Sequence, residues 1–291
     1  MRRRIAPGWV ALLLLAACGN EASGTVGVAP DELATRFAVV GDFGTGNEEE
    51  IAIANAIRAA HDRENLAAIV TTGDNIYPAG EPEDFDEAWN VPYGWAEDAG
   101  LDVVASLGNH DVKKDHEGEG MALLGMPHNW YQTQVGRVQM IVLDANDVEN
   151  PAQLAFLERS LEAPRPDDAG WRVLVFHHPA YSCAKHGSTR EVMESWVPLI
   201  AAADVDLVLN GHDHAYQRFG PVDGTTYIVT GGGGAALYDI GECEEGTPEP
   251  EVAVSTFHFV EVEATAEEMR LSAVLADGEV IDGLVLTPDG T

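Results

Sequence analysis

The chain has 291 residues, and 45% of them are hydrophobic, which is enough to bury the core of one large domain. Its 49 acidic residues against 16 lysines and arginines give a formal net charge of −33 at pH 7. This charge argues against nucleic acid as a partner, because the phosphate backbone would be repelled.

The N-terminus carries an export signal. A basic head at residues 2–4 precedes an apolar run over 10–17, which is shorter than the roughly 20 residues a membrane-spanning helix needs. The following sequence, Leu-Ala-Ala-Cys at 15–18, resembles the lipobox of bacterial lipoproteins, which implies cleavage before Cys18 and lipidation of its thiol. We therefore predict a signal peptide over 1–17, with the mature chain anchored by lipid to the extracytoplasmic side of a bacterial membrane. An ordinary signal peptide with a chance cysteine is the alternative.

Residues 18–35 are rich in Gly, Ala, Ser and acids, and we predict a flexible tether there. Beyond it, short apolar runs alternate with helical patterns, which is typical of an α/β fold. Buried strands that end in a polar motif are predicted over 37–40, 68–72, 103–107, 173–176 and 205–209. Helices are predicted over 48–63, 151–161 and 189–203.

The middle and the end of the chain indicate antiparallel strands, over 130–134, 137–143, 226–230, 256–263 and 269–275. Asp277-Gly278 is typical of a hairpin turn. No internal repeat or mid-chain linker divides the sequence, so residues 36–291 are predicted to form one domain. Two mixed sheets packed face to face between helical layers would accommodate these elements.

Five polar clusters follow the strand-like runs, where α/β sheets place their ligands. They are Gly41-Asp42-Phe43-Gly44, Gly73-Asp74-Asn75-Ile76-Tyr77, Gly108-Asn109-His110-Asp111, His177-His178-Pro179 and Gly211-His212-Asp213-His214. Asp, Asn, His and Tyr offer the oxygen and nitrogen ligands that hard and borderline metal ions prefer. A metal cluster is also the kind of positive group that would let so acidic a chain bind an anion.

The order and spacing of these clusters resemble the calcineurin-like metallophosphoesterases, whose motifs read GD, GD, GNH[DE], H and GHxH. The resemblance implies a four-layer α/β/β/α sandwich with the site at one edge of both sheets. Tyr77, three residues after Asp74, resembles the tyrosinate ligand of the purple acid phosphatase branch, of the tartrate-resistant type. A phenol with a pKa near 10 becomes a ligand at neutral pH only beside a strongly polarising cation such as Fe(III).

The resemblance implies a ligand set for two metal ions. Asp42, Tyr77 and His214 would hold Fe(III), and Asp74 would bridge to the second ion. Asn109, His177 and His212 would hold that second ion, a divalent Zn, Mn or Fe. The two aspartates are also expected to need a cation because they end adjacent strands and would repel each other without one.

Further residues are expected around the metals. The resemblance implies that His110 points at the leaving-group oxygen and that Asp111 orients it. It makes His186 a candidate for binding phosphate or donating a proton, with an ordinary exposed loop histidine as the alternative. His178 is not expected to reach the metals, because neighbours at a strand end face opposite ways. The basic residues Lys185, Arg190 and Arg218 are candidates for binding substrate.

The implied activity is an acid phosphatase that hydrolyses small phosphomonoesters by attack of a metal-activated hydroxide. A phosphodiesterase of the same family, acting on cyclic nucleotides or other diesters, is one alternative. A surface lipoprotein that binds a ligand without catalysis is the other. The sequence carries no signal for an oligomeric state.

Two cysteines, Cys183 and Cys243, remain once Cys18 is lipidated. In an oxidising compartment they are expected to form a disulfide, which would join two loops at the rim of the metal site. Two free buried thiols are the alternative.

Overall fold

The computed structural model describes residues 34–166 and 168–288. The predicted signal peptide, Cys18 and all but the last two residues of the predicted tether lie outside this part of the chain. Within it, no helix has both the length and the apolar character that crossing a membrane requires.

The first sheet has six strands in the order β13-β12-β11-β1-β2-β3. Their bounds are β1 Thr35–Val40, β2 Ala68–Thr71, β3 Asp102–Ala105, β11 Phe259–Ala264, β12 Met269–Val274 and β13 Val280–Leu286. Strands β1 to β3 run parallel, whereas β11 to β13 are antiparallel to their neighbours. The predicted turn at Asp277-Gly278 joins β12 to β13, and Gly278 has the positive φ of 89° that favours glycine.

The second sheet has seven strands in the order β10-β8-β9-β7-β6-β5-β4. Their bounds are β4 Tyr131–Val135, β5 Val138–Val142, β6 Trp171–Val175, β7 Leu207–Asn210, β8 Tyr216–Val222, β9 Thr225–Thr230 and β10 Val252–Val254. Strands β5, β6, β7 and β9 are parallel, and the other three pair antiparallel. Strands β5, β6 and β7 are buried along their whole length, as expected for strands covered on both faces.

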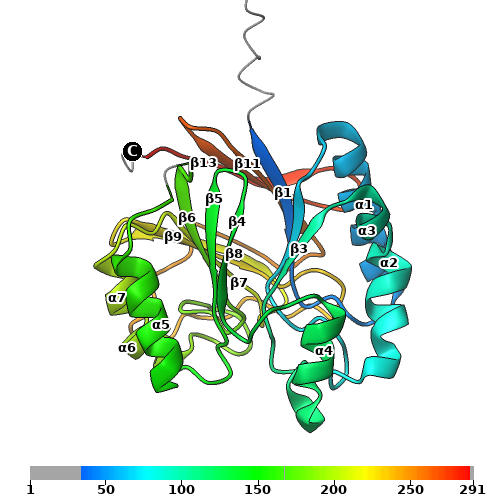
Figure 1. Ribbon diagram of the computed structural model, residues 1–291, viewed down its shortest axis with the longest axis horizontal. Coiled ribbons are helices and arrows are strands. Elements are labelled where there is room, and N and C mark those ends of the chain that lie inside the picture. The colour runs from blue at the N-terminus through cyan, green and yellow to red at the C-terminus, as the bar shows by residue number, and fades with distance from the viewer. Residues whose placement is uncertain (1–33, 167, 289–291) are drawn as a thin grey trace, which may run out of the picture.

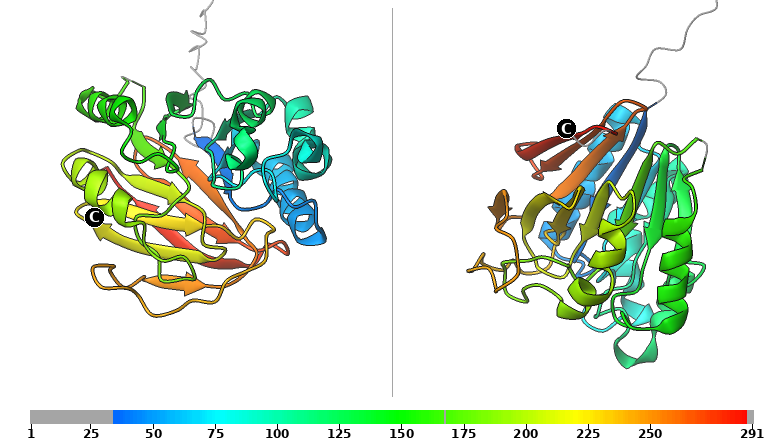
Figure 2. Two further views of the ribbon diagram at one scale, coloured as in Figure 1. Left: turned by 90° about the horizontal axis from the view of Figure 1, so that it is seen from below. Right: turned by 90° about the vertical axis from the view of Figure 1, so that its left-hand side faces the viewer.

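The two sheets pack face to face, and helices cover both outer faces (Figure 1, Figure 2). Alternate residues of each strand divide between the layers: Val39 lies in the core between the sheets, whereas Ala38 and Val40 pack toward α1 (Glu48–Glu64). Helices α5 (Pro151–Glu162), α6 (Arg190–Ser195) and α7 (Val197–Ala201) cover the second sheet. This arrangement confirms the predicted α/β/β/α sandwich of two mixed sheets.

The first two predicted helices begin and end close to where the sequence placed them. Helix α1 starts after Asn47, whose side chain accepts a hydrogen bond from the Glu50 N–H. Helix α5 has Pro151 in its first turn and Asn150 as its cap. The third predicted helix, 189–203, is instead divided into α6 and α7. Pro198 lies at the division, and a proline inside a helix removes an N–H and clashes with the preceding turn.

Other elements were not predicted, most of them because they are too short for a periodic pattern to show. They include α2 (Val91–Tyr93), α3 (Trp95–Ala99), α4 (Glu117–Leu123), the helical turns Pro82–Asp84, Asp86–Asn90 and Lys113–Asp115, and strands β8 and β10. Helices α2 and α3 lie beside α1 on the outer face of the first sheet (Figure 1).

Glu50, in the first turn of α1, is fully buried. One carboxylate oxygen accepts hydrogen bonds from the N–H groups of Thr45 and Gly46, and the other has no partner in the described part of the chain. Burial raises the pKa of Glu50 to about 7 in spite of those hydrogen bonds. The folded protein therefore holds a proton that the unfolded chain, with a pKa near 4.5, has already released.

This difference predicts that Glu50 lowers the free energy of unfolding as the pH rises from 4.5 through 7. We expect Glu50→Gln to stabilise the protein by on the order of 1 to 3 kcal/mol at pH 8 and by little at pH 4.5. Urea unfolding of wild type and Glu50→Gln at pH 4.5 and pH 8 measures this difference in the free energy of unfolding. Glu48→Gln, an exposed change in the same turn, is the control. An equal effect of Glu50→Gln at both pH values would contradict the prediction.

Candidate metal centre

The five polar clusters meet at one edge of the sandwich, because the parallel strands of both sheets end there. Asp42 follows β1, Asp74 follows β2 and Asn109 follows β3, all from the first sheet. His177 follows β6 and His212 follows β7, both from the second sheet. The loops that carry them gather below the sheets in Figure 1. The predicted position of the site, at one edge of both sheets, is the one observed.

The backbone at this edge adopts conformations that most residues avoid. Asp42, Asp74 and His212 have φ angles of 56°, 54° and 71°, in the left-handed region. Such conformations cost on the order of 1 to 3 kcal/mol each and cluster at functional sites. Gly108 allows close packing here, because a Cβ atom on it would clash with the backbone and carboxylate of Asp74.

One half of the cluster surrounds Tyr77. The Tyr77 hydroxyl lies 2.9 Å from Oδ2 of Asp74 and 3.2 Å from Nε2 of His214. His214 Nε2 in turn lies 3.4 Å from Oδ1 of Asp42. Asp42, Asp74 and His214 offer ligand atoms within 4.8 Å of one another and are buried, so these three side chains could hold one ion.

The other half of the cluster surrounds His177. Its Nε2 lies 3.5 Å from Oδ2 of Asp74, 3.1 Å from Oδ1 of Asn109 and 3.3 Å from Nδ1 of His212. Asp74 therefore touches both halves. The structure brings together all seven side chains that the sequence named as metal ligands.

Hydrogen bonds from behind fix the orientation of these side chains. Nδ1 of His177 lies 2.8 Å from the carbonyl oxygen of Thr72, and Nδ1 of His214 lies 2.7 Å from that of Ala236. A carbonyl oxygen can only accept, so Nδ1 carries a hydrogen and Nε2 faces the centre, where it could bind a metal ion once it is deprotonated. The backbone N–H of His212 donates hydrogen bonds to both carboxylate oxygens of Asp42, at 3.0 and 2.9 Å.

The electrostatics of the cluster require positive charge. Burial raises the pKa of Asp42, although His177 and His214 oppose the rise. Burial also raises the pKa of Asp74. The charge of His177 and the hydrogen bonds to Asp74 outweigh that effect and hold the pKa of Asp74 well below its usual range. The two carboxylates also raise the pKa of His177 to about 10 against the effect of burial. A proton on His177 thus supplies the charge that a metal ion would otherwise provide, so the donor set fits metal binding.

Tyr77 needs a cation to act as a ligand. Burial raises the pKa of Tyr77 far above its ordinary value, and the charges of Asp42 and Asp74 raise it further. A phenol in this position ionises only when a strongly polarising cation reverses those effects.

His110 lies at the rim of the cluster. Its ring is half-buried, 4.3 Å from the ring of Tyr77 between centroids, and its Nδ1 lies 2.6 Å from the carbonyl oxygen of Pro78. The Lys113 ammonium lies 2.9 Å from His110 Nε2, a neighbour that the sequence analysis did not identify. The backbone N–H of His110 donates a hydrogen bond to Oδ1 of Asp74, so the segment at the rim is joined to the centre of the cluster.

Asp111 has different neighbours from those expected. Its buried carboxylate accepts hydrogen bonds from the N–H groups of Gly108, Asn75 and Ile76, at 2.8, 2.8 and 3.0 Å. Burial and the charge of Asp74 raise its pKa to about 7. No hydrogen bond in the described part of the chain joins Asp111 to the His110 ring. Asp111 joins the loops after β2 and β3, because it accepts hydrogen bonds from main-chain donors of both loops and from the Asn75 side-chain amide.

His186 lies beside the centre on an exposed loop. Its ring centroid is 4.2 Å from that of His212, and its N–H donates to Oδ1 of Asp213. The other Asp213 oxygen accepts a 2.5 Å hydrogen bond from Ser182. Asp213 thus anchors this loop, a role that its place between His212 and His214 did not reveal. His178 lies 4.4 Å from His212 between ring centroids, and burial lowers its pKa to about 3.

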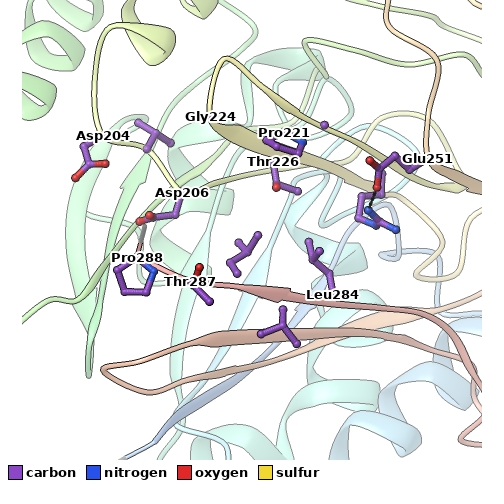
Figure 3. A pocket seen from close by; sticks show the side chains of 14 residues that line it. Asp204, Asp206, Pro221, Gly224, Thr226, Glu251, Leu284, Thr287 and Pro288 are labelled. Carbon is purple, nitrogen blue, oxygen red and sulfur yellow. Dashed lines mark hydrogen bonds and ion pairs between the residues drawn. The ribbon is translucent and has the colours of Figure 1, made fainter. Parts of the chain in front are cut away.

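The three basic candidates for binding substrate lie in different places. Lys185 lies next to His186, whereas Arg190 is exposed and pairs with Glu194. Arg218 is nine-tenths buried and pairs with Asp282 and Glu251. It lines a pocket of about 490 Å³ at the opposite end of β7 and β9 from the cluster (Figure 3). Arg218, a candidate for binding substrate, is therefore held away from the cluster by two carboxylates.

Cys183 and Cys243 form a disulfide, as predicted. It joins the loop of His186 to the loop after β9, where the Gly241 N–H also donates to the Cys183 carbonyl oxygen. Cys183 is buried, because its loop packs against the second sheet.

We expect Cys243→Ala to lower the free energy of unfolding by up to about 4 kcal/mol, because the bridge closes a loop of 60 residues. The KM for a substrate that binds beside the cluster should rise more than kcat falls, because the loop of His186 loses one of its attachments. Urea unfolding and steady-state kinetics, with and without a reductant, measure both effects. The reductant should affect wild type and leave Cys243→Ala unchanged. Identical KM values in the two proteins would contradict the positional role.

Comparison with known proteins places the chain in a family. The calcineurin-like phosphoesterase pattern matches residues 35–216, which include all five polar clusters. Purple acid phosphatase 17 of Arabidopsis thaliana is 25% identical over 69% of this chain and 69% of its own length. Human tartrate-resistant acid phosphatase type 5 is 29% identical over 77% of this chain and 79% of its own length. The solved structure of Plasmodium GAP50 has the same fold, with a TM-score of 0.72 and 21% identity over 87% of this chain and 89% of its own. The chain therefore belongs to the calcineurin-like phosphoesterases.

Proposed function

We propose that this protein is an acid phosphatase that hydrolyses phosphomonoesters at a dinuclear centre of Fe(III) and a divalent Zn, Mn or Fe. One observation carries the proposal: the Tyr77 hydroxyl lies inside the donor cluster, 2.9 Å from Asp74 and 3.2 Å from His214. A carboxylate and imidazole site for divalent ions alone has no need of a phenol, whereas Fe(III) favours one. The similarity to purple and tartrate-resistant acid phosphatases supports the same activity.

The contacts support the division of the ligands between two ions that the sequence suggested. Asp42, Tyr77 and His214 would hold Fe(III), and Asn109, His177 and His212 would hold the divalent ion. Asp74 would bridge them, because it touches Tyr77 on one side and His177 on the other. When bound, such a pair supplies an acidified water as nucleophile and positive charge for the phosphoryl group.

The surrounding residues would act on the substrate. His110, at the rim, would donate a proton to the leaving-group oxygen. The Lys113 ammonium, 2.9 Å from its Nε2, would lie beside that oxygen. His186 and Lys185, on the other side of the cluster, would bind phosphate oxygens. Asp213 would hold that loop in place through its hydrogen bonds to His186 and Ser182.

The location of the protein is a separate proposal. The lipobox-like sequence at 15–18 supports a lipid on Cys18 that holds the mature chain to the extracytoplasmic side of a membrane. Cys18→Ser should move the protein from the membrane fraction to the soluble fraction. Recovery of the variant unchanged in the membrane fraction would count against lipidation.

Metal analysis, a visible spectrum and hydrolysis assays of one purified sample test the proposed function. We expect about two metal ions per chain, a violet colour from tyrosinate bound to iron, and faster hydrolysis of p-nitrophenyl phosphate than of bis(p-nitrophenyl) phosphate. Tyr77→Phe should bleach the colour. Faster diester hydrolysis would favour the phosphodiesterase, and metal-replete protein without hydrolysis of either ester would favour a ligand-binding lipoprotein.

A further inference from the structure

The segment after β9 surrounds one of the proposed iron ligands from outside the metal cluster. The Ala236 carbonyl oxygen lies 2.7 Å from Nδ1 of His214, and the Tyr238 N–H donates to the His214 carbonyl oxygen at 3.0 Å. The Tyr238 ring stacks on the His214 ring with a centroid separation of 4.0 Å and an interplanar angle of 12°. Tyr238 lies beyond residues 35–216, which the family pattern matches, so the motifs give no indication of it.

The Tyr238 ring also contacts the loop expected to bind substrate. The Lys185 ammonium lies over the ring, 4.1 Å from its centroid, and the His186 ring meets its edge at 5.3 Å and 68°. The His214 ring and the Lys185 ammonium thus each lie about 4 Å from the centroid of the Tyr238 ring. Tyr238 therefore contacts a candidate metal ligand and the loop expected to bind substrate.

The loops that carry these residues are tied together close by. The Cys183–Cys243 disulfide and the hydrogen bond from Gly241 N–H to the Cys183 carbonyl oxygen join them on one side of Tyr238. Ser188 and Thr247 are joined by a further hydrogen bond of 2.6 Å. Tyr238 is therefore held against a fixed loop and has little freedom to turn away from His214.

We propose that Tyr238 is a positioning residue, which fixes the ring plane of His214 and couples that ring to the loop of Lys185 and His186. The inference rests on the proposed metal centre. The terminal torsion of a histidine has broad preferences, and the contacts at Nδ1 and Nε2 of His214 hold the ring only by its edge. A stacked ring restrains rotation about that torsion, and groups that orient a metal ligand typically contribute 10- to 100-fold to metal affinity.

Two substitutions of Tyr238 distinguish the contribution of its ring from that of its hydroxyl. Tyr238→Phe keeps the stacked ring, and Tyr238→Leu removes it while keeping an apolar side chain of similar length. We expect Tyr238→Leu to release iron to a chelator about 10- to 100-fold faster than wild type and to shift the visible band. Tyr238→Phe should stay within about twofold of wild type in both measurements. Equal release from Tyr238→Leu and wild type would overturn the proposal.

Crystal structures of the metal-free proteins make the test independent of the proposed centre. We expect the His214 ring to keep its orientation in wild type and Tyr238→Phe, and to turn or take two orientations in Tyr238→Leu. An unchanged ring in Tyr238→Leu would contradict a positioning role even if the variant lost metal. If wild type itself takes up no metal, the proposed function fails, and the crystal structures still decide whether Tyr238 positions His214.

Discussion

Asp74→Asn is expected to reduce kcat for p-nitrophenyl phosphate about a thousandfold, a loss of ~4 kcal/mol of transition-state stabilisation. Asp74 lies between the two halves of the cluster, 2.9 Å from the Tyr77 hydroxyl and 3.5 Å from Nε2 of His177. An amide is a weak ligand and carries no charge, so it cannot bridge two cations. The variant should hold one ion per chain or none, which metal analysis of the same preparation measures.

An exposed aspartate of the same sheet provides the matched control. Asp102 begins β3 at the edge remote from the cluster, and Asp102→Asn should leave both activity and metal content within about twofold of wild type. Asp74→Asn should still fold without metal, because the change removes one of two buried carboxylates that lie close together. Two bound ions and more than a tenth of wild-type activity in Asp74→Asn would show that Asp74 is not a bridge.

His110→Ala is expected to slow hydrolysis of alkyl phosphates by about 100- to 10,000-fold, the range typical of a lost general acid. Its half-buried ring at the rim of the cluster suits proton donation to a leaving group. Aryl phosphates with an acidic leaving group, such as p-nitrophenyl phosphate, need less help from an acid. Their hydrolysis should therefore slow much less, and a plot of rate against leaving-group pKa should become steeper in the variant.

His128→Ala serves as the control, because His128 is exposed and its ring packs on Trp130 rather than on the cluster. It should leave the rate with both kinds of ester unchanged. An equal loss with alkyl and aryl phosphates in His110→Ala would be inconsistent with proton donation and would favour a role in binding phosphate.

The gathering of these candidate metal ligands could be predicted from sequence because its information is local. Each ligand lies within a few residues of the end of a buried strand, and parallel strands bring those ends to one edge. Asp42 and Asp74 are examples: each follows a run of apolar residues, and the fold places the two side by side. The layers of the sandwich were predictable for the same reason, because apolar runs and helical periods are also local patterns.

The residues that support the cluster were not predictable, because their partners are distant in the sequence. Asp213 binds Ser182 and His186 across an interval of about 30 residues, and Tyr238 stacks on His214 from the far side of β8 and β9. Asp111 follows His110 directly, yet the fold turns it toward Asn75 instead. A polar residue next to a catalytic candidate gives no indication of which backbone donors the fold will bring to it.

The division of the candidate ligands between the two sheets bears on the order in which the chain would fold and bind metal. The first sheet supplies both carboxylates, the second supplies His177, His212 and His214, and neither set holds two ions alone. Strand β1 reaches its place beside β11 only when Thr35 pairs with Ala264, near the other end of the domain. Metal uptake should therefore come last, after the two halves have docked, and each bound ion would then resist their separation. The violet colour, once present, would report that a chain has completed folding.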